Sequence, residues 1–252
     1  MRYKLPKINL FLWSCGIIVI IAILLRLVIY NLGITIPKDA LLYFDLAQKM
    51  SNGENIFLTN NLNSSLGVPP LFPLLLSYIN TFFNNFILSA FLLNTSVNVF
   101  SIIIFAFIVM FLTKDKAVSL LCMLLAAIHP SLIDCSIECL RESLYLFFVL
   151  AGVGSFFIFF QKSNLWGYCC LSGIFLGLGS LTRIETIEVI PILFLWYVFA
   201  CFFKKIKAKN FFYCAIIFIS GWLISLELIC FAAPCSWSYI FSYYAKINNY
   251  IF

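Results

Sequence analysis

The sequence has few charged residues, because only 10% of its 252 positions are Asp, Glu, Lys or Arg, against about a quarter in a typical soluble domain. No internal repeat and no Gly/Ser-rich linker divides it. Hydrophobic residues make up 63% of the chain, and the mean hydropathy is +1.06. These values exclude a water-soluble globular fold. They predict an all-α integral membrane protein with a single transmembrane domain over residues 1–252.

The sequence also has only one histidine, and its ten cysteines include no C-x-x-C pair. The cysteines are scattered, mostly within apolar segments, where they are expected to be small packing residues. Basic residues lie mainly in short loops, and anionic lipid headgroups are the only partner that this pattern requires. Nothing in the pattern indicates nucleic-acid binding.

Long apolar runs are abundant, and an α-helix needs about 20 apolar residues to cross the hydrocarbon. Seven segments meet this expectation. A shorter apolar segment, about 70–83, is predicted to be re-entrant or interfacial. The seven predicted spans are roughly 9–30, 86–112, 117–133, 140–160, 165–182, 187–203 and 211–233.

The loops on alternate sides of the predicted spans differ in their Lys and Arg content. One side carries ten such residues, whereas the other carries only Lys38, Lys49, Arg183 and Lys246. The positive-inside rule therefore places the N-terminus in the cytoplasm and the loop 31–85 outside. An odd number of spans places the C-terminus outside as well.

Most acidic residues fall in or near the outward-facing segments. Acidic residues contribute little to topology, so this asymmetry needs another explanation. One explanation is a functional site on the outer face, and the other is that carboxylates stabilise helix starts through the helix dipole. The outward acidic residues are Asp39, Asp45, Glu54, Asp134, Glu138, Glu142, Glu185 and Glu188.

The first outer loop contains a short amphipathic segment that begins at Asp39. At 100° per residue, Asp39, Tyr43, Leu46 and Met50 share one helical face. The segment is predicted to be an interfacial helix with its apolar side on the bilayer. Asp39 would then lie close to the end of the first span.

Three segments of the chain resemble a known family when they are taken together. The first runs from Asp39 through Tyr43 to Gly53 and continues in Pro69-Pro70-Leu-Phe-Pro73; the others are His129 to Tyr145 and Gly173 to Glu185. Their order and spacing resemble the first periplasmic loop and two later span junctions of GT-C glycosyltransferases. The likeness is to the bacterial branch related to protein O-mannosyltransferases and lipid A aminoarabinose transferases.

The resemblance implies transfer of a sugar from a polyprenyl-phosphate donor to a lipid, glycan or protein acceptor on the outer face. It also implies a bacterial inner membrane location, a GT-C-like fold and Asp39 at the catalytic aspartate position. Such a transfer needs a base for the acceptor proton and a cation or metal to stabilise the departing phosphate.

The sequence departs from the family in two respects. Ala40 stands where the family often has a second acidic residue, which puts a paired-carboxylate metal site in doubt. The resemblance also covers only the N-terminal part of a full enzyme, and the C-terminal part of the family architecture has no counterpart in this sequence. No cofactor is therefore certain, and a divalent metal remains an open option, with His129 and Asp39 as weak candidate ligands.

Tyr43, Glu138, Arg141 and Arg183 are the candidate substrate-binding residues. Asp134, Glu138 and Glu142 recur every four residues, so a continuous helix would align them in one polar stripe with Arg141 beside it. Binding of acceptor or phosphate competes there with a self-neutralised ion cluster. Arg183 is expected to hold a lipid phosphate or to extend to lipid headgroups, and Arg26 is expected to extend to headgroups.

Three functions remain compatible with the sequence. The first is a polyprenyl-phosphate-dependent glycosyltransferase. The second is a catalytically inactive or truncated membrane subunit that needs a larger membrane partner. The third is a small transporter or lipid flippase, which would need charges near mid-membrane and a pair of broken helices in matching halves, and neither is evident.

Overall fold

The computed structural model describes residues 10–33, 36–52, 68–161, 166–204 and 208–232, and every regular element in these ranges is an α-helix. The all-α fold class is therefore confirmed. The helices are α1 (Leu10–Leu32), α2 (Lys38–Ser51), α4 (Leu71–Phe83), α5 (Phe86–Thr113), α6 (Lys116–Ile128), α7 (Pro130–Ile137), α8 (Glu142–Gln161), α9 (Trp166–Ser180), α10 (Thr186–Lys204) and α11 (Ala208–Ala232).

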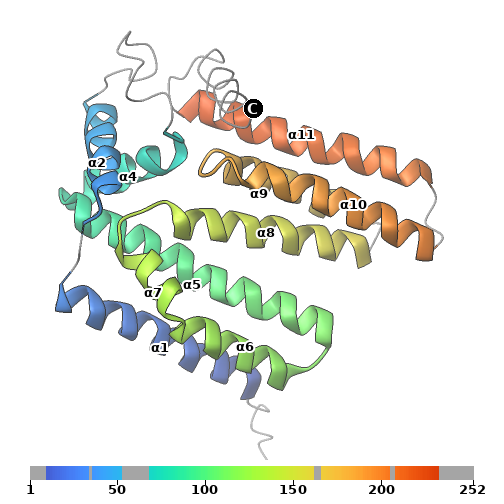
Figure 1. Ribbon diagram of the computed structural model, residues 1–252, viewed down its shortest axis with the longest axis horizontal. Coiled ribbons are helices and arrows are strands. Elements are labelled where there is room, and N and C mark those ends of the chain that lie inside the picture. The colour runs from blue at the N-terminus through green and yellow to red at the C-terminus, as the bar shows by residue number, and fades with distance from the viewer. Residues whose placement is uncertain (1–9, 34–35, 53–67, 162–165, 205–207, 233–252) are drawn as a thin grey trace, which may run out of the picture.

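The long helices lie side by side along the long axis of the molecule (Figure 1). Neighbours in contact run in the order α1, α6, α5, α8, α9 and α11, and α10 packs against α8 and α9. The short helices α2, α4 and α7 gather at one end of this bundle, and the α5–α6 turn lies at the opposite end (Figure 1). We refer to the first as the α2 end and to the second as the α5–α6 end.

Three described helices are long and apolar enough to cross a membrane, namely α1, α5 and α8, and the bent pair α6 and α7 would make a fourth. These match the predicted spans 9–30, 86–112, 140–160 and 117–133. The other three predicted spans correspond to α9, α10 and α11, whose apolar stretches in the described residues are shorter than a full span. Helix α4 is also short and apolar, in agreement with the prediction for 70–83.

The predicted span 117–133 is not one straight helix. Helix α6 ends at Ile128, and α7 begins at Pro130 with a bend of 51° between them. Proline has no amide hydrogen and its ring collides with the preceding turn, so the helix cannot continue through this position. Pro130 instead occupies the first turn of α7, where no amide hydrogen is needed.

Side-chain caps begin two of the long helices, α5 and α6. The Asn85 side chain accepts a hydrogen bond from the Leu88 amide at 3.1 Å and so begins α5. Asp115 accepts from the Ala117 amide at 2.8 Å and begins α6. Such caps satisfy amides that have no partner inside the helix, and they explain why each helix begins where it does.

The bundle is held by separate apolar clusters along its length. One cluster at the α2 end joins α2 and α4 to α5, α8 and α9, and includes Phe72, Leu76 and Phe148. A second is rich in aromatic residues and joins α8 through α11. Helices α9 and α11 approach closely at Gly173, where a Cβ atom would collide with the Phe218 carbonyl oxygen, as small residues permit at contacts between membrane helices.

Candidate functional site

Helix α2 carries Asp39 in its first turn, directly after the extended residue Pro37. Asp39 is exposed, and no hydrogen bond or ion pair of its carboxylate is found among the described residues. Other residues of α2 form a buried face, in which Ala40 and Ala47 are completely inaccessible. The prediction of an amphipathic helix is confirmed, but its apolar face packs on α4 and the bundle rather than on the bilayer.

Tyr43 lies on the buried face of α2 and is 6% exposed. Its ring meets Phe72 edge to face, with the centroids 5.2 Å apart. The Arg141 guanidinium lies 6.0 Å from the centroid of the Tyr43 ring, within the range of a cation–π contact. Two of the predicted substrate-binding residues, Tyr43 and Arg141, therefore lie together.

Four charged side chains act on the Tyr43 hydroxyl. Burial raises the pKa of Tyr43; the nearby Arg141 guanidinium lowers it, and the carboxylates of Glu142 and Asp39 raise it further. Arg183 also lowers the pKa of Tyr43. Asp39 lies on α2, Arg141 and Glu142 lie at the start of α8, and Arg183 lies in the turn after α9. Tyr43 is therefore the point at which three segments distant in sequence converge.

The segment between α7 and α8 positions Glu138 and Arg141. Helix α7 ends at Ile137, Glu138 is its C-cap, and Cys139 has a φ of +56°. A left-handed residue at this place ends the helix and turns the chain. The predicted continuous stripe of Asp134, Glu138 and Glu142 is therefore wrong, because α8 begins anew at Glu142.

Two hydrogen bonds hold the segment between α7 and α8 in place, one donated from α5 and one from α8. The Asn94 side-chain amide donates to the Leu140 carbonyl oxygen at 2.8 Å. The Ser143 hydroxyl donates to the Cys135 carbonyl oxygen at 2.9 Å. Arg141 itself is half-buried and has no ion pair with a carboxylate in the described ranges.

Arg183 lies in the turn between α9 and α10 and contacts two carboxylates. Its Nη2 atom is 2.9 Å from Glu185 Oε1, and its Nη1 atom is 3.3 Å from Glu142 Oε1. The hydrogen bond from Arg183 holds the pKa of Glu185 below its usual value and raises that of Arg183. Its guanidinium also lies 5.5 Å from the centroid of the Tyr145 ring.

The turn that carries Arg183 is bonded to the start of α4. The Leu71 amide at the start of α4 donates to the Leu181 carbonyl oxygen at 3.3 Å. Thr182 is completely buried, and its hydroxyl donates to the Gly179 carbonyl oxygen at 2.6 Å. The Arg183 turn and the α2–α4 segment therefore form one structural unit at the α2 end.

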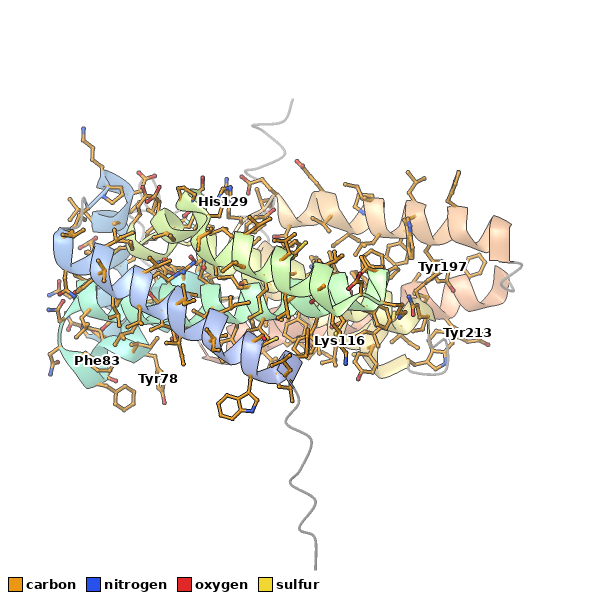
Figure 2. All side chains as sticks on the ribbon, turned by 90° about the horizontal axis from the view of Figure 1, so that it is seen from below. Tyr78, Phe83, Lys116, His129, Tyr197 and Tyr213 are labelled. Atoms are coloured by element: carbon orange, nitrogen blue, oxygen red, sulfur yellow. The ribbon has the colours of Figure 1, made fainter. Side chains whose placement is uncertain are left out.

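The structure does not support a joint metal site of His129 and Asp39. No group of three or more His, Cys, Asp or Glu side chains with metal-binding geometry occurs in the described part of the chain. His129 is exposed at the bend between α6 and α7 (Figure 2).

The prediction for Arg26 is wrong, because its side chain is completely buried rather than extended to the headgroups. Its Nη2 atom donates to Asn98 Oδ1 at 2.6 Å. Its Nη1 atom donates to the Ala22 carbonyl oxygen at 2.9 Å and to that of Ala127 at 3.3 Å. Ala127 lies in the last turn of α6, whose final carbonyl groups have no partner within the helix. Arg26 therefore binds the end of the broken span.

The predicted residues Asp39, Tyr43, Arg141 and Arg183 thus share one neighbourhood, whereas His129 does not join it. Sequence reasoning underestimated Glu142 and Glu185, the two carboxylates that bind Arg183. The spacing of Arg183 and Glu185 in one turn was an available signal for that pair. No signal in the sequence connected Glu142 with Arg183, because 41 positions separate them.

A family model described as dolichyl-phosphate-mannose-protein mannosyltransferase matches residues 67–232, which is more than half of the chain. With the bundle of apolar helices, this match defines an integral membrane protein in the class of GT-C membrane glycosyltransferases. The chain belongs to the dolichyl-phosphate-mannose-protein mannosyltransferase family. No curated protein and no solved structure matches it.

The matched residues contain Glu138, Arg141 and Arg183 but not Asp39 or Tyr43. The roles of the two residues on α2 therefore depend on their position beside the matched segments. That position is given by the charges converging on Tyr43 and by the bond between Leu71 and Leu181.

Proposed function

We propose that the protein transfers a sugar from a polyprenyl-phosphate donor to an acceptor at the α2 end of the bundle, on the outer face of a bacterial inner membrane. The observation that carries this proposal is the meeting of three segments at the α2 end in a chain of this family. Arg141 lies over Tyr43, which is one turn from Asp39 on α2, and the Arg183 turn is bonded to the start of α4. In this orientation the N-terminus is cytoplasmic and the C-terminus lies outside.

Asp39 is the proposed general base. Its carboxylate is exposed at the first turn of α2, so an acceptor hydroxyl can approach it from the aqueous side. In the transfer, the acceptor oxygen forms a bond to the anomeric carbon as the bond from that carbon to the phosphate oxygen breaks. Asp39 takes the acceptor proton, and the bonding electrons leave with the polyprenyl phosphate.

Arg141 is the proposed group that stabilises the leaving phosphate. Its guanidinium lies over Tyr43 and has no carboxylate partner among the described residues, so its charge is available to an incoming anion. Charge-assisted bonds from arginine to phosphate are short and strong. Arg183 already contacts two carboxylates, and we assign it the positioning of Glu142 and of the start of α8.

Glu138 lies in the same loop as Arg141, at the end of α7. We assign it to acceptor binding, where its carboxylate can accept hydrogen bonds from sugar or lipid hydroxyl groups.

The test is release of polyprenyl phosphate from radiolabelled polyprenyl-phosphate sugars by membranes that contain the wild-type chain, Asp39→Asn or Asp45→Asn. We expect Asp39→Asn to lose at least about 100-fold in rate, since a positioned base contributes about 10²–10⁴-fold. Asp45 is a matched control on the same helix, exposed and paired only with Lys49, and Asp45→Asn should retain the wild-type rate.

A non-catalytic membrane subunit is the second candidate, and it is favoured by the position of Asp39 outside the matched residues. It predicts equal rates for wild type and Asp39→Asn, and recovery of activity only when a larger membrane partner is present. Normal release by Asp39→Asn would therefore reject the first proposal.

A further inference from the structure

A groove lies between α5, α8 and α9, and its polar end is at the α5–α6 end of the bundle. These helices enclose a groove of about 720 Å³, within the range of about 300–1,000 Å³ that is typical of ligand pockets. Its walls are apolar along most of their length, and Phe107 on its rim is 51% exposed, so the groove is accessible from the side of the bundle.

The polar residues of the groove gather at one end. Lys114 and Lys116 line it at the α5–α6 turn, together with Tyr168 from the start of α9. Both lysines are exposed, and neither forms an ion pair within the described residues. Lys116 lies toward the end of the bundle opposite Phe83 (Figure 2).

Asp115 lies between the two lysines but is engaged elsewhere. Its carboxylate accepts hydrogen bonds from the Ala117 and Val118 amides at the start of α6. The Lys114 ammonium lies 4.4 Å from the centroid of the Phe111 ring, which keeps it beside the groove. The Lys114 ammonium therefore remains available to an anion at the groove end, and that of Lys116, which also lines the groove, lies 5.9 Å from the centroid of the Phe11 ring on α1.

The depth of the groove matches one leaflet of a bilayer. Along α5 it extends from Ile104 to Lys114, which at 1.5 Å per residue is about 15 Å. The hydrocarbon of a bilayer is about 30 Å thick, so one leaflet contributes about half of that. Tyrosine and lysine at the polar end are the residues typical of the membrane–water interface.

We infer that this groove binds an anionic glycerophospholipid, with its headgroup at Lys114, Lys116 and Tyr168 and an acyl chain along the apolar walls. In the orientation proposed above, this lipid belongs to the cytoplasmic leaflet. The site lies at the opposite end of the bundle from Asp39 and Arg141, so it is separate from the proposed donor phosphate site.

The test is native mass spectrometry of the full chain, purified in detergent and titrated with phosphatidylglycerol, phosphatidylcholine of the same acyl chains, or polyprenyl phosphate. We expect wild type to retain phosphatidylglycerol about tenfold more strongly than phosphatidylcholine, since each nearby lysine favours an anionic lipid. The double variant Lys114→Gln/Lys116→Gln should lose this preference. Lys38→Gln/Lys49→Gln, which removes two lysines at the α2 end, should keep it.

A groove-filling variant tests the position of the acyl chain. Ser155 lines the groove on α8, and Ser155→Phe should reduce retention of both phospholipids. Equal retention of the two phospholipids by wild type would overturn the inference, as would a preference that survives in Lys114→Gln/Lys116→Gln. It would also be overturned if polyprenyl phosphate displaced phosphatidylglycerol from wild type, because the groove would then hold the donor chain.

Discussion

The cluster around Tyr43 and the network around Arg26 are both built on arginine, but they differ in burial and in partners. Arg183 at the α2 end is partly exposed and contacts two carboxylates. Arg26 is completely buried and donates only to neutral oxygens, from Asn98, Ala22 and Ala127.

This difference distinguishes residues proposed to serve the reaction from residues that stabilise the fold. Partly exposed charges can exchange one partner for another at low cost, because water stabilises the intermediate arrangements. A buried arginine has no such alternative, and its removal leaves buried acceptors without donors. We therefore expect variants of the first region to change activity mainly, and variants of the second to change stability mainly.

Among the arginines of the two regions, the largest effect is expected at Arg141. Arg141→Gln removes the cation proposed to stabilise the leaving phosphate, and loss of one such donor lowers the rate by about 10²–10³-fold. The rate of polyprenyl phosphate release measures this change. Arg141→Lys should recover part of the activity because it keeps the charge.

Arg183→Gln is the matched comparison for Arg141→Gln. Its guanidinium already contacts Glu142 and Glu185, so its loss should lower the rate by only about tenfold, through misplacement of α8. A larger loss in Arg183→Gln than in Arg141→Gln would reverse the two assigned roles.

The next effect is a loss of stability at Arg26. Arg26→Leu leaves Asn98 Oδ1 and the Ala127 carbonyl oxygen without their donor, which should cost about 2–4 kcal/mol. Thermal unfolding in detergent micelles measures it. Asn31→Ala, which removes an exposed hydrogen bond on the same helix, should change stability by less than about 0.5 kcal/mol.

Arg26 would acquire a functional role if the outcome were different. A variant Arg26→Leu that unfolds at the wild-type temperature but no longer releases polyprenyl phosphate would show that the buried arginine serves the reaction. In that case it would be wrong to assign activity to the region around Tyr43 and stability to the region around Arg26.

The smallest effect concerns the pH dependence of the Arg183–Glu185 pair. The pKa of Glu185 is lower in the folded protein than its ordinary value of 4.5, so the pair contributes stability above pH 4.5 and loses it as the pH falls through the folded pKa. The contribution should be below about 1 kcal/mol, because Glu185 is 44% exposed.

Melting temperatures at pH 6 and pH 3 test this expectation. The difference between wild type and Arg183→Gln should be larger at pH 6 than at pH 3. A difference that is the same at both values would show that the pair does not titrate in this range.

Much of the fold follows from the sequence, as α1, α5 and α8 illustrate. Each is a long apolar run, and a helix is the form in which such a run satisfies its own backbone in lipid. The turns at Asn85 and Asp115 are equally local, because a capping side chain bonds to amides two or three residues away. Asp39 lies in the first turn of the short amphipathic helix α2, which also agrees with the sequence prediction.

The errors concern residues whose environment depends on distant segments. Arg26 was expected at the headgroups because its position near the end of a span permits that. It is instead buried, because Asn98 and Ala127 supply acceptors from α5 and α6. The stripe of Asp134, Glu138 and Glu142 failed because it assumed a continuous helix, whereas Cys139 adopts a left-handed conformation.

By itself, the sequence determined the class of protein and most of its helices, because these depend on composition and on neighbours within a few residues. Only the tertiary structure decided that Glu142 binds Arg183 and that Arg141 lies over Tyr43. These contacts join segments separated by 41 or more positions, and only the packing of α2, α8 and α9 at one end of the bundle brings them within reach.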